Sequence, residues 1–152
     1  MFWEQSASLV HGTRHVPVSA KAATSKGKPT ELDLDVALCF SGNMCVELIK
    51  QKCDTPSVYR ELIETKGGGF HHWGITAADF DREVENYKKQ GYTMAFDAAL
   101  DNGTRFAYFD TVDDLGGMIE FFEPTEIFLG TFAMLEDSAR NWDGSDPIRR
   151  IS

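Results

Sequence analysis

Short apolar runs with polar breaks between them recur along the chain, and each run predicts a β-strand. The clearest of these runs are residues 34–40, 44–49, 92–96, 105–110 and 118–122. Residues 41–43 (Ser-Gly-Asn) join the first two runs, which predicts a β-hairpin. Strand signals are weaker in residues 1–10 and 13–19. Residues 21–29 are small, polar and lysine-rich, so we expect a surface loop there.

Three segments have helical spacing instead. Residues 58–65 follow a Pro-Ser pair and stop at the three glycines 67–69, which predicts a short helix. Asp79 is a suitable N-cap for a second helix that ends near Gln90. A third, amphipathic helix is expected after Pro124, before a tail that packs on the body. The second half of the chain therefore has the order strand, helix, strand, strand, strand.

Composition limits the class of protein. A chain of 152 residues with 42% hydrophobic residues can build one domain of ordinary core size. Its net charge of −9 argues against a nucleic acid or an anionic membrane as a partner. No apolar run approaches the roughly 20 residues that span a bilayer, and no signal peptide is recognisable, so we expect a cytoplasmic protein. The three cysteines lack C-x-x-C spacing and are interpreted as reduced thiols.

A histidine pair opens another short strand, residues 70–75. Side chains alternate between the faces of a strand, so His72 shares a face with Gly74, whereas His71 shares the opposite face with Trp73 and Ile75. We therefore expect only one of the two histidines to line any one site. His72 is the candidate, and His71 should point toward a helical layer.

Two glutamates stand among apolar neighbours in other predicted strands. Glu47 lies in the hairpin and Glu120 in the last strand. A single glutamate of this kind usually faces water, and a single strand histidine is usually a packed residue. A carboxylate inside a strand is costly to bury unless it is paired, protonated or bound to a cation. One histidine with two carboxylates is also a recurring ligand set for a divalent transition metal, so these residues suggest a metal site.

Several motifs, in their order along the chain, resemble one known family. They are ELIKQ, DTPSVYRELIE, GGGFHHWGI, RFAYFDT and GGMIEFFEP. The stretch from about residue 28 to residue 124, and also the tail WDGSDPIR, is similar to the vicinal oxygen chelate superfamily of glyoxalases, bleomycin resistance proteins and dioxygenases. Within it, the chain most resembles the glyoxalase-like branch that includes methylmalonyl-CoA epimerase.

This resemblance implies an α+β fold in which paired βαβββ modules form a curled, half-open mixed sheet with helices on its convex side. We expect one domain over residues 1–152. Its expected parts are a partial first module (1–54), a linker helix (55–69), the second module (70–124) and a C-terminal helix and tail (125–152). Compared with the family, the first strand and helix of the first module are not recognisable before residue 34. Three explanations stay open: they lie upstream, they are lost, or residues 1–18 replace them. A loss would expose a sheet edge, so we expect a homodimer.

The resemblance also implies the site. His72, Glu120 and Glu47 match the family's metal ligands, and His11 and His15 are the available substitutes for a ligand missing from the first module. The expected cofactor is a divalent ion (Zn, Ni, Co, Mn or Fe) with open coordination positions.

The implied activity is that of a metal-dependent isomerase, epimerase or lyase that stabilises an enolate-type intermediate of a small-molecule substrate. Glu120 or Glu47 would act as the base, and ring-opening oxygenation on iron is a further possibility within the family. The alternative is a non-catalytic protein that binds or sequesters a drug or another small ligand. Its pocket would be lined by aromatic residues, namely Phe70, Phe106, Tyr108 and Phe122.

Overall fold

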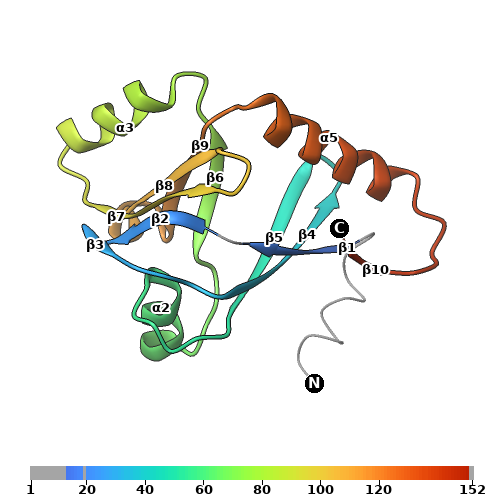
Figure 1. The fold of residues 1–152 in the computed structure, drawn as a ribbon, viewed down its shortest axis with the longest axis horizontal. Coiled ribbons are helices and arrows are strands. Elements are labelled where there is room, and N and C mark those ends of the chain that lie inside the picture. The colour runs from blue at the N-terminus through green and yellow to red at the C-terminus, as the bar shows by residue number, and fades with distance from the viewer. Residues whose placement is uncertain (1–12, 19, 151–152) are drawn as a thin grey trace. The chain divides into compact units, whose positions relative to one another are not determined.

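The structure is a computed structural model and describes residues 13–18 and 20–150 (Figure 1). The chain divides into two compact units. The described part of the first unit consists of residues 13–18, 33–52 and 129–150, and that of the second unit of residues 20–32 and 53–128.

The second unit is built on a six-stranded mixed sheet. In spatial order its strands are β3 (Lys28–Pro29), β2 (Ala20–Ser25), β7 (Met94–Leu100), β8 (Arg105–Phe109), β9 (Met118–Phe122) and β6 (His72–Thr76). Only β6 and β9 pair in parallel; the other neighbours are antiparallel. Helix α3 (Phe80–Lys89) follows β6 along the chain and precedes β7. The order β6, α3, β7, β8, β9 is the predicted βαβββ module, which is thereby confirmed.

Two helices pack on opposite faces of this sheet, as Figure 1 shows. Helix α3 covers the face where Phe109 and Phe121 are buried, and it contributes Phe80, Val84 and Tyr87 to that apolar core. Asp79 caps the helix as predicted, because its side chain accepts a hydrogen bond from the backbone N–H of Arg82. The opposite face carries the candidate site residues of β8 and β9.

Helix α2 (Val58–Lys66) packs on that opposite face through Tyr59, whose ring contacts Phe96 and Tyr108. Ser57 caps its start, and Gly67 ends it in the left-handed conformation with φ 74°. A left-handed backbone is strained for residues with a Cβ, so glycine suits this position. The predicted helix of residues 58–65 is confirmed within one residue of its end.

Arg105 connects α3 to the sheet. Its guanidinium pairs with Asp81 of the helix and with Glu123 after β9, both at 2.8 Å, and lies 4.7 Å from the centre of the Phe80 ring. These hydrogen bonds lower the pKa of Asp81 and of Glu123 and raise that of Arg105.

The first unit contains a four-stranded sheet with the strand order β10 (Ile148–Arg150), β1 (Thr13–Val18), β4 (Leu34–Ser41) and β5 (Met44–Gln51). Strands β4 and β5 form the predicted hairpin. The C-terminal tail pairs with β1 as the parallel strand β10, so it packs on the body as expected.

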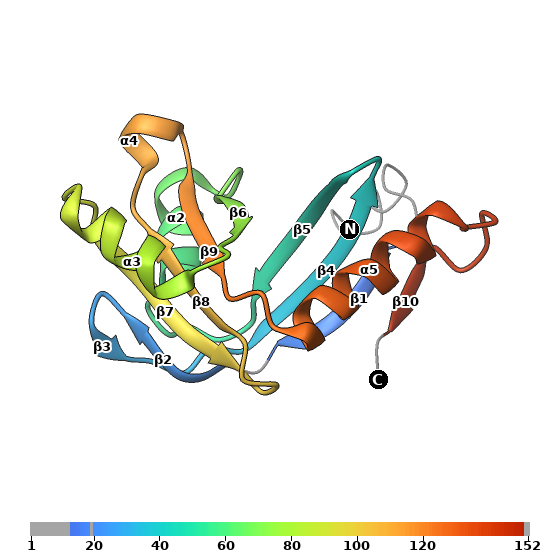
Figure 2. The same cartoon turned by 90° about the horizontal axis from the view of Figure 1, so that it is seen from above.

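Helix α5 (Glu126–Arg140) is the predicted C-terminal helix, and Figure 2 shows it from above. Its first three residues belong to the second unit, where Phe128 stacks on Phe122 with ring centres 4.7 Å apart. The remainder belongs to the first unit, where Phe132 meets Phe40 of β4 edge to face and Leu135 is buried. The predicted α+β fold class is confirmed.

Three local predictions need correction. Residues 21–29 are not a loop but form most of the hairpin β2–β3, because the backbone of β2 pairs with the edge of β7, and Ala23 is buried there. The strand predicted at residues 92–96 is β7, which begins two residues later and runs to Leu100. A short helix, α4 (Val112–Leu115), stands where only a turn was expected. Among the described residues no helix separates β1 from β4.

Candidate metal centre

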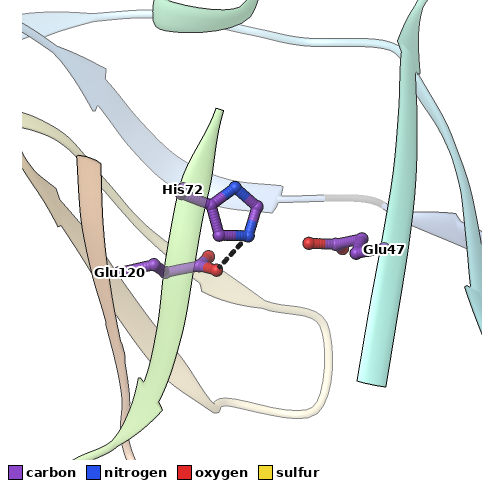
Figure 3. Close-up of side chains that lie close together, drawn as sticks. All are labelled: Glu47, His72 and Glu120. Atoms are coloured by element: carbon purple, nitrogen blue, oxygen red, sulfur yellow. Dashed lines mark ion pairs between the residues drawn. The ribbon is translucent and has the colours of Figure 1, made fainter. Parts of the chain in front are cut away.

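His72 and Glu120 lie side by side on β6 and β9, the two parallel strands of the second unit. Gly74 is directly opposite Glu120 in the strand register, and His72 is two residues from Gly74, so both side chains point to the same face. Nε2 of His72 lies 3.1 Å from Oε2 of Glu120 (Figure 3). The side chains are only 9% and 3% exposed, so this is a nearly buried imidazole–carboxylate pair.

This pair fits a divalent ion. Imidazole nitrogen and carboxylate oxygen are both common ligands of divalent transition metals, at roughly 2.0–2.2 Å from the ion. Two such ligands at right angles around one ion are about 3 Å apart, which agrees with the 3.1 Å between Nε2 and Oε2. A carboxylate that is 2% exposed also needs a positive partner, which either an imidazolium or a metal ion provides.

His71 lies on the same side as His72, contrary to the prediction. It precedes β6, so strand alternation does not apply to it. Its ring stacks on Tyr59 with centres 4.8 Å apart, and its Nδ1 lies 3.0 Å from Nδ1 of His72. Burial, and then the neighbouring His72, lower the pKa of His71 to about 4, and a backbone hydrogen bond with Val58 opposes that shift. His71 is therefore neutral at neutral pH.

Three of the four predicted pocket aromatics share the face of Glu120. In the register of β8 and β9, Phe106 is opposite Phe122, and Tyr108 is opposite Glu120. Phe106 and Tyr108 are buried, and Tyr108 accepts a hydrogen bond of 3.1 Å from the hydroxyl of Tyr59. These rings line the sheet around the pair.

The fourth aromatic, Phe70, lies before β6 and is 52% exposed, and its ring packs against Trp73 with centres 4.6 Å apart. It also borders Gly117, whose close approach to the ring leaves no room for a Cβ atom. Phe70 therefore lies at the surface, whereas the other three rings are largely covered.

Glu47, the third predicted ligand, lies in the middle of β5 in the first unit and is half-buried. By strand alternation it shares a face with Cys45. Burial, and then the charge of Glu47, raise the pKa of Cys45 to about 12. The role of Glu47 as a ligand remains a prediction. His11 lies outside the described residues, and His15 is on β1 opposite Ala37.

Sequence reasoning missed Tyr59 and His71 as neighbours of the site. Tyr59 comes from a helix that the sequence places between the modules, and nothing in the helical pattern says which side chain reaches the sheet. His71 also borders a groove of about 270 Å³ between α2 and the segment after β8. The signal that could have identified His71 is the glycine run before it, because residues 67–69 all have positive φ and delay the start of β6.

Comparison with known proteins identifies the family. The sequence model of the Glyoxalase/Bleomycin resistance protein/Dioxygenase superfamily matches residues 10–108. The chain belongs to this superfamily, as the resemblance predicted. No curated protein matches the chain.

Two solved structures are similar to this protein. A hypothetical protein from Bacillus halodurans C-125 is 16% identical with a TM-score of 0.51, and the match covers 77% of this chain and 94% of the other. At that identity the likeness supports the fold alone. A glyoxalase family protein from Bacillus cereus, also 16% identical, has a TM-score of 0.34 over 70% of this chain and 78% of its own. None of the described helices is long and apolar enough to cross a membrane.

Proposed function

We propose that this protein is a divalent-metal-dependent enzyme of the isomerase, epimerase or lyase type that acts on a small molecule with a carbonyl group. The observation that carries the proposal is the nearly buried pair of His72 and Glu120, 3.1 Å apart on the parallel strands of a βαβββ module. Members of this superfamily commonly use a metal ion. A neutral histidine and carboxylates, with positions left open for substrate, suit that use.

The residues of the chain would have distinct roles. His72 and Glu120 would hold the ion, and we propose Glu47 of β5 as the third ligand. The ion would supply Lewis acidity toward a carbonyl oxygen, which makes a proton on the adjacent carbon easier to remove. Glu120 is held by His72 and is 2% exposed, so proton transfer falls more naturally to the half-buried Glu47. Glu47 would take the proton from that carbon and return it, or return it to a neighbouring atom in an isomerisation.

A second candidate function is small-molecule binding without catalysis. The rings of Phe106, Tyr108 and Phe122 on the face of the pair favour it, because apolar pockets with a few polar groups bind drug-like ligands well. In this case the His72–Glu120 pair would orient a polar group of the ligand. The two candidates differ in whether a metal is bound in stoichiometric amount.

We further propose a homodimer. Among the described strands, β5 ends the first sheet and β6 ends the second, so each has paired neighbours on one side only. Edge strands present free backbone groups that pair readily with a second copy of the chain. Sedimentation velocity should give twice the monomer mass of 17.0 kDa, and a monomer at micromolar concentration would contradict the dimer.

Metal analysis of the purified protein tests the main proposal. We expect about one divalent ion per chain in the parent, and a loss of most of it in His72→Ala, Glu120→Ala and Glu47→Ala. Glu123→Gln is the matched control, because Glu123 directly follows β9 but binds Arg105 instead. It should keep its metal.

The two functions predict different results for the parent. A parent that stays metal-free after incubation with Zn²⁺, Ni²⁺, Co²⁺, Mn²⁺ and Fe²⁺, yet binds hydrophobic dyes, would overturn the enzyme proposal and favour the binding function. Loss of metal in His72→Ala and Glu120→Ala but not in Glu47→Ala would show that His72 and Glu120 are ligands and that Glu47 is not.

A further inference from the structure

Two adjacent histidines in this chain contact each other through the same ring atom. Nδ1 of His71 and Nδ1 of His72 are 3.0 Å apart, which is hydrogen-bond distance. A neutral imidazole has one nitrogen that donates and one that accepts. One Nδ1 must therefore carry a proton and the other must accept it, because two lone pairs or two N–H groups would repel at this distance.

The other nitrogen of His72 decides which arrangement holds. Nε2 of His72 faces the carboxylate of Glu120 at 3.1 Å. If Nε2 is to bind an ion, its lone pair must be free, and the proton of neutral His72 then sits on Nδ1. Nδ1 of His71, 3.0 Å away, can accept that N–H, and the proton of neutral His71 is then on Nε2.

We propose that His71 is a positioning residue that accepts a hydrogen bond from Nδ1–H of His72 and so holds the His72 ring in the tautomer and orientation that direct Nε2 toward Glu120. Metal-binding histidines generally donate their second N–H to a carboxylate, a carbonyl or water. Here the acceptor is the preceding residue in the chain, and the proposal rests on the proposed metal function.

The surroundings of His71 fix its ring. Tyr59 stacks on it at 4.8 Å, and Tyr108 meets it edge to face at 5.4 Å. Tyr59 and Tyr108 are themselves joined by a hydroxyl hydrogen bond. His71 is therefore packed against two aromatic rings, one from a helix and one from a strand, which hold the plane of its ring.

Two substitutions separate hydrogen bonding from packing. His71→Asn places its amide oxygen where Nδ1 now lies and so keeps the acceptor, but it loses the aromatic stack. His71→Phe keeps the stack and loses the acceptor, and the groove beside His71 leaves space for the slightly larger ring. If His71 acts through the hydrogen bond, His71→Asn should keep more of the metal affinity than His71→Phe. If it acts only through packing, His71→Phe should keep more.

Calorimetric titration with Co²⁺ measures the first effect. We expect His71→Phe to bind Co²⁺ about 10- to 100-fold more weakly than the parent, the usual effect of losing such an outer hydrogen bond, and His71→Asn to recover most of that loss. Equal affinity in all three proteins, or weaker binding in Asn than in Phe, would overturn the proposal. Thermal unfolding of both variants checks that they fold.

Nitrogen-15 NMR of the parent loaded with Zn²⁺ supplies a readout other than activity or affinity. Long-range correlations should show Nδ1 of His72 protonated and Nδ1 of His71 unprotonated. The opposite pattern, with a proton on Nδ1 of His71, would overturn the proposal whatever the metal results are. If the parent binds no divalent ion, the proposed function fails and this inference fails with it. If the parent binds Co²⁺ and both His71 variants bind it equally well, only this inference fails.

Discussion

Nε2 of His72 and Oε2 of Glu120 are 3.1 Å apart between two parallel strands, and both side chains are almost completely buried. Such a pair is held in place by the sheet before any ligand arrives. A ligand that binds only the folded state stabilises it by about 2.7 kcal/mol at a concentration of 100 times Kd.

Thermal unfolding should reveal this linkage. We expect the preferred divalent ion to raise the Tm of the parent by roughly 5–10 °C at that saturation, given 2–4 °C per kcal/mol for a chain of this size. His72→Ala should show no rise, because the imidazole ligand is lost. A Tm rise of the same size in His72→Ala would mean that the ion binds elsewhere.

The hydroxyls of Tyr59 and Tyr108 provide a second prediction. Tyr59→Phe removes the donor of a buried hydrogen bond and keeps the ring, so we expect a loss of about 0.5–1.5 kcal/mol in the free energy of unfolding. Tyr59→Ala also removes the stack on His71, and should cost about 3–5 kcal/mol. Urea unfolding of both variants measures these losses. Similar small losses in both would show that α2 contributes little packing to this face.

Much of the second unit could be predicted from the sequence. Helix α3 was recognisable because its cap, Asp79, and its apolar face follow local rules. His72 and Glu120 were paired correctly on one face, because both lie within regular strands where side chains alternate.

The failures lie where local rules do not apply. Ala23 belongs to a segment of small and polar residues, and it is buried only because β2 finds the edge of β7, a strand about 70 residues away in sequence. His71 was assigned to the wrong side because the strand begins at His72, two residues later than predicted, after the positive-φ glycines 67–69, so alternation begins only at His72. Tyr59 reaches His71 through tertiary packing that no sequence period encodes.

Arg105 should make stability depend on acid pH. Its hydrogen bonds lower the pKa of Asp81 and Glu123 below their ordinary values, so both carboxyls stay ionised in the folded state at pH values where the unfolded chain takes up protons. Their contribution is therefore present above about pH 4–4.5, the ordinary carboxyl range, and is lost as the pH falls below it.

Arg105→Gln tests this dependence. We expect a Tm a few degrees lower at pH 7 and a smaller further drop between pH 5 and pH 3 than in the parent. Lys88→Gln is the control. It removes an exposed ion pair with Glu85 on α3, the helix that also carries Asp81, and it should change the Tm little. If the Tm of Arg105→Gln falls as steeply between pH 5 and pH 3 as that of the parent, the ion pairs of Arg105 are not the source of this pH dependence.

Cys45 should be unreactive in the folded protein. Burial, and then the charge of Glu47, raise its pKa to about 12, whereas an ordinary thiol has a pKa of about 8.5. At pH 8 the thiolate that attacks alkylating reagents is then scarcer by roughly a factor of 10³ than in the unfolded chain. Peptide mapping after timed treatment with iodoacetamide should show Cys45 modified far more slowly in native than in urea-unfolded protein.

The raised pKa of Cys45 also affects stability at alkaline pH. Above pH 8.5 the folded state keeps its thiol proton while the unfolded chain loses it. This part of the stability is therefore present below that pH and declines as the pH rises toward 12. Cys45→Ala should flatten that alkaline decline. Glu47→Gln should speed the alkylation of native Cys45 only slightly, since burial is the larger cause of the raised pKa. Rapid alkylation of Cys45 in the native parent would show that β5 opens to solvent and that its burial does not protect the thiol.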